Sequence, residues 1–406
     1  MHAVVAGAGI SGIFCAAALV SRGWDVTLFE RENGPCRGLS YAPGFLAWAG
    51  AEDARRFAPS ASSPFPAESG FAGRLRHRAY FRAAKTAFTS EREALLSDFC
   101  AWCLELERED AARLGLAGLE VPGFWELLSK DDAARAAELF PGARILSRTE
   151  ALEAEPSLSD AVPFEAALEI PSALSFNSLF LARRALKALE ESEGRFRARF
   201  GTALSGLEIR DGRVRAAKTA DGKAVPCDAA VLANGSEALP MLASLGLALP
   251  AAPFTGCTFT AELENEEMLP SRSLFFPALP LFLTRADRRI RAYGKFALGA
   301  RTESEKRAEY NRLYDGTLAS LANVRLEASS VRFWSGTADA LPDGFPAAGT
   351  AAAEGLAVCA AHGARGLLFA RGGAEIIAAR LSGTAGEIRE DFVLACSPGR
   401  FAQKKN

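Results

Sequence analysis

The first 30 residues change their hydrophobic spacing twice. A short apolar run at 3–6 predicts a buried strand, helical spacing continues to about Arg22, and a second apolar run at 25–29 predicts another strand. The sequence Gly-Ala-Gly-Ile-Ser-Gly at 7–12 joins the first strand to the helix, and Glu30 follows the second strand. This order predicts a βαβ unit, in which a helix connects two parallel strands.

The rest of the chain mixes helical and strand-like patterns. Helical periodicity is found over 91–113, 130–139, 179–191, 303–321 and 367–381. Apolar runs predict strands at 195–203, at 207–216 with a hairpin turn at Asp211-Gly212, across 250–301 as antiparallel strands, and at 331–334. Residues 51–72 are rich in Ser, Pro, Ala and Gly, which predicts a long loop.

Composition excludes several classes of function. The net charge of −2 gives no bulk attraction to nucleic acid or anionic lipid. The first strand begins almost at Met1, which leaves no room for a signal peptide, and no apolar run is long enough to span a bilayer. The segment 274–283 contains two prolines and is interpreted as strand plus turn, with a membrane-docking loop as the alternative. We therefore expect a cytoplasmic protein.

The eight cysteines are scattered, which suits reduced thiols in a cytosol. Cys15, Cys227 and Cys359 lie in apolar segments and are interpreted as small core residues. Cys100 and Cys103 have redox or metal spacing, but they lie in a helical pattern without a second pair. Zinc takes about four ligands and the chain has three histidines, so no metal site is predicted.

The glycine-rich turn has the chemistry of a dinucleotide site. Gly7 lets the chain turn out of the strand, Gly9 lets a pyrophosphate approach the backbone, and Gly12 lets the helix lie close to the strand. The N-terminus of the helix presents free N–H groups to the phosphates. Glu30 can accept hydrogen bonds from an adenosine ribose and would repel the 2′-phosphate of NADP, which leaves NAD or FAD.

Two later segments favour FAD over NAD. At 227–235 an apolar strand ends in Ala-Asn-Gly, and at 356–367 a second strand ends in a glycine-containing loop that begins at His362. A helix follows that loop. Its N-terminus would lie beside the ligand and stabilise the negative charge of a reduced flavin.

On these residues the chain resembles the D-amino-acid oxidase-like flavoenzymes, with D-amino-acid dehydrogenase and glycine oxidase as the nearest types. The resemblance spans nearly the whole length and is carried by the Gly7–Glu30 unit, the serine-containing loop 37–44, the strand 231–235, Phe333-Trp334-Ser335-Gly336, the segment 341–349 and the loop 362–367. The C-terminal part is also similar to the oxidoreductase domain of the bifunctional tRNA wobble-uridine modification enzyme.

The resemblance implies an α/β fold with a Rossmann-type FAD-binding domain and a discontinuous α+β substrate domain on a mixed, largely antiparallel sheet. The FAD-binding domain would comprise 1–50, 140–160, 175–250 and 332–406, and the substrate domain 51–139, 161–174 and 251–331. FAD would be bound non-covalently. Its expected contacts are Gly7, Gly9, Ile10, Ser11, Gly12, Glu30, Arg31, Arg37, Gly38, Ser40, Ala203, Ala233, Asn234, Gly235, Gly336, His362, Gly363, Ala364, Arg365, Gly366 and Leu367.

The implied reaction is oxidation of a C–N bond in an amine or amino-acid-like substrate by hydride transfer to flavin N(5), as in amine and amino-acid oxidases or dehydrogenases. The expected catalytic residues are His362 and Arg365. His362 would tune the flavin, or else bond to backbone at a strand end. Arg365 would balance charge on the reduced flavin, or else cap a surface loop. The electron acceptor would be O2, a quinone or a redox protein. The alternative function is a partner-dependent FAD subunit for electron transfer or tRNA modification.

One departure from the family pattern concerns the substrate. After Trp-Ser-Gly the family supplies an arginine, in the pattern G-x-R-P, which grips the substrate carboxylate. Here Ala338 takes that place and Asp339 follows it. A buried carboxylate without a cation is unfavourable. Either another arginine replaces the missing one, or the substrate is a specialised amine rather than a simple D-amino acid, with Asp339 pairing with a second amine. The candidate replacements are Arg301, Arg332 and Arg371.

Overall fold

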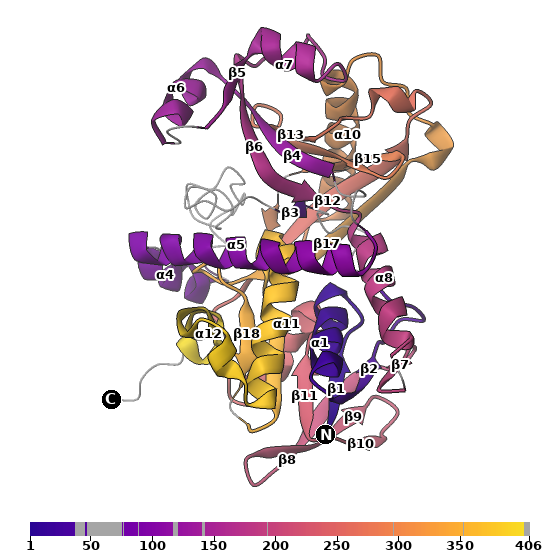
Figure 1. Cartoon of the computed structure of the whole chain (residues 1–406), viewed down its shortest axis with the longest axis vertical. Coiled ribbons are helices and arrows are strands. Elements are labelled where there is room, and N and C mark those ends of the chain that lie inside the picture. The colour runs from indigo at the N-terminus through magenta and orange to yellow at the C-terminus, as the bar shows by residue number, and fades with distance from the viewer. Residues whose placement is uncertain are drawn as a thin grey trace.

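The computed structural model describes residues 1–36, 45–46, 75, 77–87, 89–116, 121–139, 143–192, 194–294, 296–351 and 353–401. Two lobes are stacked along the long axis, and α5 (Ser90–Arg113) crosses between them (Figure 1). The lower lobe is built on a six-stranded sheet and the upper lobe on a ten-stranded sheet, which confirms the expected α/β class. None of the described helices is long and apolar enough to cross a membrane.

The six-stranded sheet contains the predicted βαβ unit. β1 (His2–Ala6) pairs in parallel with β2 (Asp25–Phe29), and α1 (Ile10–Ser21) connects them. Every pair in this sheet is parallel except β18–β19, so the carboxyl ends of the parallel strands meet at one edge. The full order is β18 (Ala347–Thr350), β19 (Leu356–Ala360), β11 (Ala229–Leu232), β1, β2 and β7 (Phe196–Arg199).

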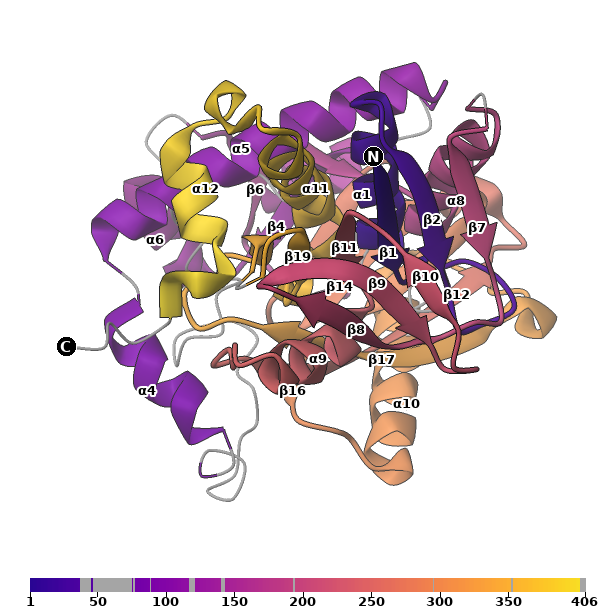
Figure 2. The same ribbon diagram turned by 90° about the horizontal axis from the view of Figure 1, so that it is seen from below.

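Helices cover one face of this sheet and a smaller sheet covers the other (Figure 2). On the helical face, α1 packs between α8 (Ser178–Glu190) and α11 (Gly366–Ser382). The opposite face is covered by β8 (Leu204–Arg210), β9 (Arg213–Thr219) and β10 (Ala224–Pro226). The predicted hairpin turn between β8 and β9 is present, with φ of 54° at Asp211 and 72° at Gly212.

α5 and α11 cross at a glycine, which explains their close contact. A Cβ on Gly372 would lie 2.3 Å from Sγ of Cys103, so only glycine allows α11 to pack here. Cys100 and Cys103 are buried at this crossing. The described residues contain no group of His, Cys, Asp and Glu that could hold a metal ion. This crossing attaches α5 to the lower lobe rather than to the upper one.

The ten-stranded sheet forms the upper lobe. Its pairs are antiparallel except β4–β13. α10 (Glu303–Ser320) and α7 (Arg148–Ala154) pack on one face over a buried apolar cluster, and α6 (Lys130–Leu139) packs near β4 and β6. The strand order is β16 (Ala297–Leu298), β12 (Ala252–Glu262), β15 (Arg289–Tyr293), β14 (Leu281–Ala286), β13 (Ser273–Phe276), β4 (Val121–Leu128), β6 (Ala166–Ser175) and β3 (Phe45–Leu46), with β17 (Arg332–Ala340) on β12 and β5 (Ile145–Ser147) on β6.

Four segments lie in a different lobe from the one expected. α5 falls within 51–139, the range expected for the substrate domain, but it packs on the lower lobe. β5 and α7 fall within 140–160 but belong to the upper sheet, because β5 pairs with β6. β17 pairs along its whole length with β12 and so lies in the upper sheet.

The possible membrane-docking segment 274–283 is instead the β13–β14 hairpin, in which Leu274, Leu281 and Leu283 are completely buried beneath α10. That alternative is therefore wrong, because the apolar side chains of the segment fill a core.

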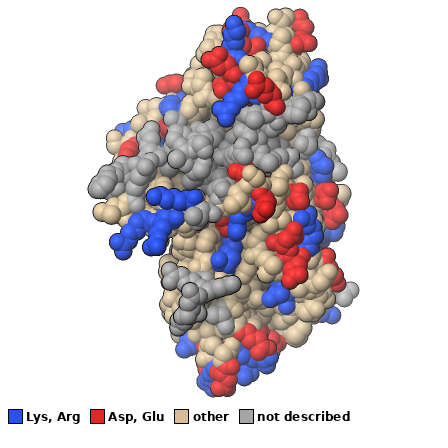
Figure 3. Space-filling model, turned by 90° about the vertical axis from the view of Figure 1, so that its left-hand side faces the viewer, with Lys and Arg blue, Asp and Glu red and all other residues tan. Residues whose placement is uncertain are grey.

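The remaining helices are short. Basic side chains gather at mid-height on the face shown in Figure 3. The exposed basic residues of α4 (Arg78–Ala87) are Arg78, Arg82 and Lys85. The other short helices are η2 (Gly235–Glu237), α9 (Ala238–Ser244), η3 (Glu266–Met268), η4 (Ala328–Ser330), η5 (Gly363–Arg365), η6 (Ala385–Glu387), α12 (Glu390–Cys396) and η7 (Pro398–Phe401).

Candidate functional site

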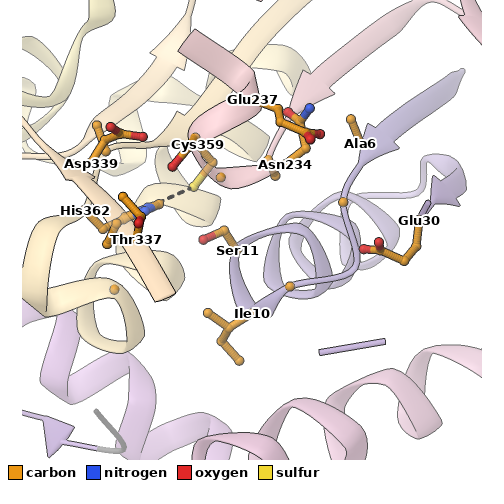
Figure 4. Close-up of a pocket in the computed structure, with 18 of the residues that line it drawn as sticks. Ala6, Ile10, Ser11, Glu30, Asn234, Glu237, Thr337, Asp339, Cys359 and His362 are labelled. Carbon is orange, nitrogen blue, oxygen red and sulfur yellow. Dashed lines mark hydrogen bonds between the residues drawn. The ribbon is translucent and has the colours of Figure 1, made fainter. Parts of the chain in front are cut away.

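A cavity of about 520 Å³ lies along the carboxyl ends of the parallel strands. This edge is where α/β sheets bind ligands. The cavity is elongated, with Glu30 at one end and Thr337, Asp339 and His362 at the other (Figure 4). Its described lining residues are Ala6, Gly7, Gly9, Ile10, Ser11, Phe29, Glu30, Arg31, Glu32, Ala203, Leu204, Ala233, Asn234, Gly235, Ser236, Glu237, Phe296, Thr337, Ala338, Asp339, Cys359, Ala361, His362, Gly363, Gly366 and Leu367.

The glycine-rich turn forms the floor at the middle of the cavity. Gly7 has φ +96°, and a Cβ on it would lie 2.7 Å from the carbonyl oxygen of Ala233. A Cβ on Gly12 would lie 1.8 Å from the carbonyl oxygen of Gly7, so the helix could not pack here with any other residue. A Cβ on Gly9 would meet nothing within 4 Å. Gly7 and Gly12 therefore serve the fold, whereas Gly9 leaves open space for a ligand.

The first turn of α1 is prepared for an anion. Its N-cap residue, Gly9, makes no side-chain cap, and the turn itself contains no acidic residue. The N–H groups of this turn therefore have no side-chain cap from the helix, and they lie at the positive end of the helix dipole. A phosphate at this position would accept hydrogen bonds from backbone N–H groups.

Glu30 lies at the end of β2, beside the same turn. Its carboxylate accepts hydrogen bonds from the N–H of Ala8 at 2.8 Å and of Glu32 at 3.0 Å. These bonds hold the carboxylate against the cavity, where it can accept bonds from a ribose. Arg31, the next residue, forms an ion pair with Glu237, which comes from the opposite wall. This pair joins the two walls of the cavity near Glu30.

The far end of the cavity is formed where β19 ends. The chain turns there with positive φ at Ala361 (57°) and Gly363 (59°), and α11 then begins at Gly366. Gly366 and Leu367 line the cavity, and the first turn of α11 has no acidic residue. A second helix N-terminus is therefore directed at the cavity, as the sequence predicts, and would stabilise negative charge on a ligand.

The imidazole of His362 contacts a cysteine. Its Nε2 lies 3.5 Å from Sγ of Cys359, which also lines the cavity (Figure 4). A hydrogen bond from Cys15 lowers the pKa of the Cys359 thiol, with His362 and Ser11 contributing in the same direction. The same bond, together with burial, raises the pKa of Cys15. Sequence reasoning missed Cys359 as a cavity residue; its place three residues before His362, at a strand end, is the signal that could have identified it.

The wall beside His362 is formed by β17, whose last residue, Ala340, pairs with His362 in an antiparallel bridge. Thr337, Ala338 and Asp339 line it, and the hydroxyl of Thr337 lies 2.9 Å from that of Thr255. Burial raises the pKa of Asp339, although a hydrogen bond from Ser236 opposes the shift, and Oδ2 of Asp339 has no hydrogen-bond partner. Arg31 is the single arginine among the described lining residues, and it lies at the other end.

Most of the expected contacts are brought together in the cavity. Arg37, Gly38 and Ser40 lie outside the described residues. Gly12, Gly336, Ala364 and Arg365 do not line the cavity among the described residues. Arg365 is buried with its guanidinium 5.8 Å from the ring centre of Phe369, and a surface location for it is therefore wrong. Its role toward a flavin stays a prediction, as does that of His362.

The proposed replacement arginines have other partners. Arg371 forms ion pairs with Asp110 at 2.7 Å and Glu375 at 3.5 Å, at the crossing of α5 and α11. Arg301 pairs with Glu309 at 3.7 Å. Arg332 is exposed and donates to the carbonyl oxygens of Ser329 and Val331. None of the three lies among the described lining residues of the cavity.

Comparison with known proteins agrees with this geometry. The chain is similar to D-amino acid dehydrogenases of Cereibacter sphaeroides (27% identical, covering 99% of this chain and 97% of the relative) and Methylobacterium radiotolerans (26%, covering 99% and 100%). In fold it is similar to glycine oxidase from Geobacillus kaustophilus (TM-score 0.68, 22% identical, 94% of each chain) and L-amino acid deaminase from Proteus vulgaris (TM-score 0.69, 18% identical, covering 98% and 93%). The tRNA-modification similarity is not shown by these comparisons. 

The shape and lining of the cavity fit FAD. Open space at Gly9, a carboxylate at Glu30 and two uncapped helix N-termini along one elongated cavity suit the pyrophosphate, ribose and ring system of FAD. The family model described as FAD-dependent oxidoreductase, or DAO, matches residues 2–380. The chain therefore belongs to the DAO family of FAD-dependent oxidoreductases.

Proposed function

We propose that this protein oxidises a C–N bond in an amine or amino-acid-like substrate, and that this substrate is not a simple D-amino acid. The relatives named above act on D-amino acids, glycine or L-amino acids according to their names, which supports the reaction class. The oxidase or dehydrogenase type depends on the electron acceptor, for which O2 and a quinone or redox protein are the candidates.

The residues of the chain would divide the work along the cavity. The N-terminus of α1 and the space at Gly9 would hold the pyrophosphate, and Glu30 would hold the adenosine ribose. FAD, when bound, supplies the two-electron acceptor for C–N oxidation. The N-terminus of α11 would offset negative charge at the far end, where His362 is oriented by Cys359. The substrate would lie against His362 and the adjoining wall formed by β17.

The observation that carries the substrate proposal is the pair Ala338 and Asp339 in this wall. A carboxylate held where the family places its arginine would meet Ala338, which offers no hydrogen bond, and the acidic Asp339. Burying such a carboxylate without a cation would cost several kcal/mol. An ammonium group would instead be attracted, because Oδ2 of Asp339 lacks a hydrogen-bond partner. The wall therefore favours an amine over a simple D-amino acid.

The test begins with the purified protein. Its visible absorption should show a flavin, and acid precipitation should release the colour into the supernatant if FAD is bound non-covalently. Anaerobic titration with D-amino acids, glycine, sarcosine, N-substituted amino acids and polyamines should then reduce the flavin with a specialised amine. Rapid reduction by simple D-amino acids would overturn the substrate proposal. A flavin that no amine reduces would favour the partner-dependent subunit.

A further inference from the structure

Arg291 lies in β15, near the middle of the ten-stranded sheet. Its neighbours Ile290 and Ala292 are completely buried in the cluster beneath α10. Because side chains alternate along a strand, Arg291 points to the opposite face of the sheet. Its partner across the strand pair is Thr260 in β12, which points to the same face.

That face reaches the FAD cavity near Gly256, although Arg291 itself is not among the described lining residues of the cavity. Gly256 lies four residues before Thr260 in β12 and so shares its face. A Cβ on Gly256 would lie 2.7 Å from the ring of Phe296, and Phe296 lines the cavity. Arg291 therefore lies on the inner surface of the upper lobe, farther from Ala338 than Gly256 is.

Among the residues that the structure describes, the buried guanidinium of Arg291 has no counter-charge. The residue is 6% exposed, and its Nε and Nη1 have no hydrogen-bond partner. Among the described residues it has no ion pair, whereas Arg289, two positions earlier, pairs with Glu262. Its neighbours across the strands, Thr260 and Thr284, are buried hydroxyls. Arg291 therefore lies in a polar row, on an inner face that also carries the buried side chains of Thr258 and Glu126.

A buried guanidinium that lacks a partner is unfavourable, so its presence calls for an explanation, and a bound anion would supply the missing partner. The planar fork of arginine matches a carboxylate or phosphate with two hydrogen bonds. We propose that Arg291 forms an anion-binding subsite for an acid group of the substrate. This inference rests on the proposed function and specifies its substrate class as an amine that also carries a carboxylate or phosphate.

The register of the sheet places this acid group away from the reacting carbon. Ala338 pairs with Phe254, and Arg291 pairs with Thr260, six residues farther along β12. At about 3.3 Å per residue, the two positions are separated by about 20 Å along the strand. An arginine side chain spans only part of that length. The acid group is therefore separated from the C–N bond by a spacer, unlike the α-carboxylate of an amino acid.

The test measures binding to the FAD-loaded protein through the absorption spectrum of the flavin, without turnover. The probes are ω-aminocarboxylates and ω-aminoalkyl phosphates of increasing length, each matched to the alkylamine without the acid group. We expect the acid group of the longer probes to tighten binding about ten- to a hundredfold, the range for hydrogen bonds to charged groups. The carboxylate and phosphate series distinguish the two possible anions.

The variants are Arg291→Met, Arg291→Lys and the control Arg289→Met, which alters a paired arginine on the same strand and face. Arg291→Met should abolish the preference for the acid group, Arg291→Lys should keep part of it, and Arg289→Met should leave it unchanged. Without ligand, Arg291→Met should melt at or above the wild-type temperature, because it removes an unpaired buried charge. A purely structural arginine would instead lower the melting temperature.

The inference fails if the acid group adds nothing in the wild type, or if Arg291→Met and the wild type prefer it equally. It also fails if short α-amino acids depend on Arg291 as strongly as the long probes do. Failure of the proposed function looks different: no amine would then reduce the flavin, although the acid group would still perturb its spectrum through Arg291.

Discussion

Gly9 and Gly12 lie three residues apart in the glycine-rich turn, and the structure gives them opposite roles. A Cβ on Gly12 would lie 1.8 Å from the carbonyl oxygen of Gly7, and no such contact falls below 3.0 Å in real proteins, so α1 would have to move by the difference, 1.2 Å. A Cβ on Gly9 meets nothing within 4 Å and enters the cavity. The two alanine variants should therefore fail in different ways.

The expected energies follow from these contacts. Overpacking of this kind costs about 1–3 kcal/mol, and the better helix propensity of alanine returns about 1 kcal/mol at most. Gly12→Ala should therefore destabilise the protein with or without FAD. Gly9→Ala should change the stability of the FAD-free protein by less than about 1 kcal/mol, the range for an N-cap exchange. It should nevertheless lose FAD, because its methyl group occupies the space of the pyrophosphate.

The assay is thermal unfolding with and without added FAD, together with the visible absorption of the purified proteins. A ligand present at about a hundred times its dissociation constant stabilises by about 2.7 kcal/mol. The control is Gly386→Ala, whose Cβ also meets nothing within 4 Å, at a residue that is not among the described lining residues of the cavity. Added FAD should stabilise the wild type and this control by that amount. It should not stabilise Gly9→Ala. Full FAD occupancy in Gly9→Ala would refute the assignment of the pyrophosphate to this turn.

Three further outcomes are expected. Glu30→Ala should release FAD on dialysis and lower the melting temperature at limiting FAD, since the carboxylate held by Ala8 is the ribose partner; full retention after dialysis would contradict this role. Burial raises the pKa of Asp339, so its carboxyl group stays protonated in the folded state at pH values where it has already ionised in the unfolded chain. The free energy of unfolding therefore falls as the pH rises from the ordinary carboxyl range through the raised pKa. Melting curves across pH should therefore show Asp339→Asn to be more stable than the wild type at neutral pH, and an unchanged pH profile would show that Asp339 is solvated. Asp343 is 1% exposed and accepts hydrogen bonds from Arg400 at 2.8 Å and from Arg92 at 2.6 Å. Asp343→Ala should therefore lower the free energy of unfolding, measured by chemical denaturation, by about 3–5 kcal/mol, because two arginines lose their partner. A loss below about 1 kcal/mol would mean that water screens the cluster.

The FAD-binding half of the site could be predicted because its chemistry is local in the sequence. Gly7, Gly9 and Gly12 fall within one turn, and Glu30 follows the adjacent strand. Backbone conformation and helix polarity then fix where a phosphate can bind, whatever the rest of the chain does. The loop at His362 was found for the same reason, because a strand, a tight turn and a helix follow one another without interruption.

The division into lobes was harder to predict, because it depends on pairings between distant segments. The pattern at 145–147 indicates a strand equally well in either lobe, and only its pairing with β6 places it in the upper sheet. β17 likewise continues directly into the chain that forms the lower sheet, yet all nine of its residues pair with β12. Helix α5 illustrates the same limit, since its contact with Gly372 joins segments that are far apart in the sequence.

The substrate half of the site shows why a missing residue is easier to recognise than its replacement. The exchange at Ala338 is visible in the sequence because the surrounding pattern is kept. Arg291 carries no such signal: it interrupts the apolar run of β15 between Ile290 and Ala292, as an exposed residue of an ordinary edge strand would. Its significance depends on its burial and on the absence of a counter-charge among the described residues, and both are properties of the folded sheet. The candidates chosen from the sequence, Arg301 and Arg371, fail by the same criterion, because each already has a carboxylate partner.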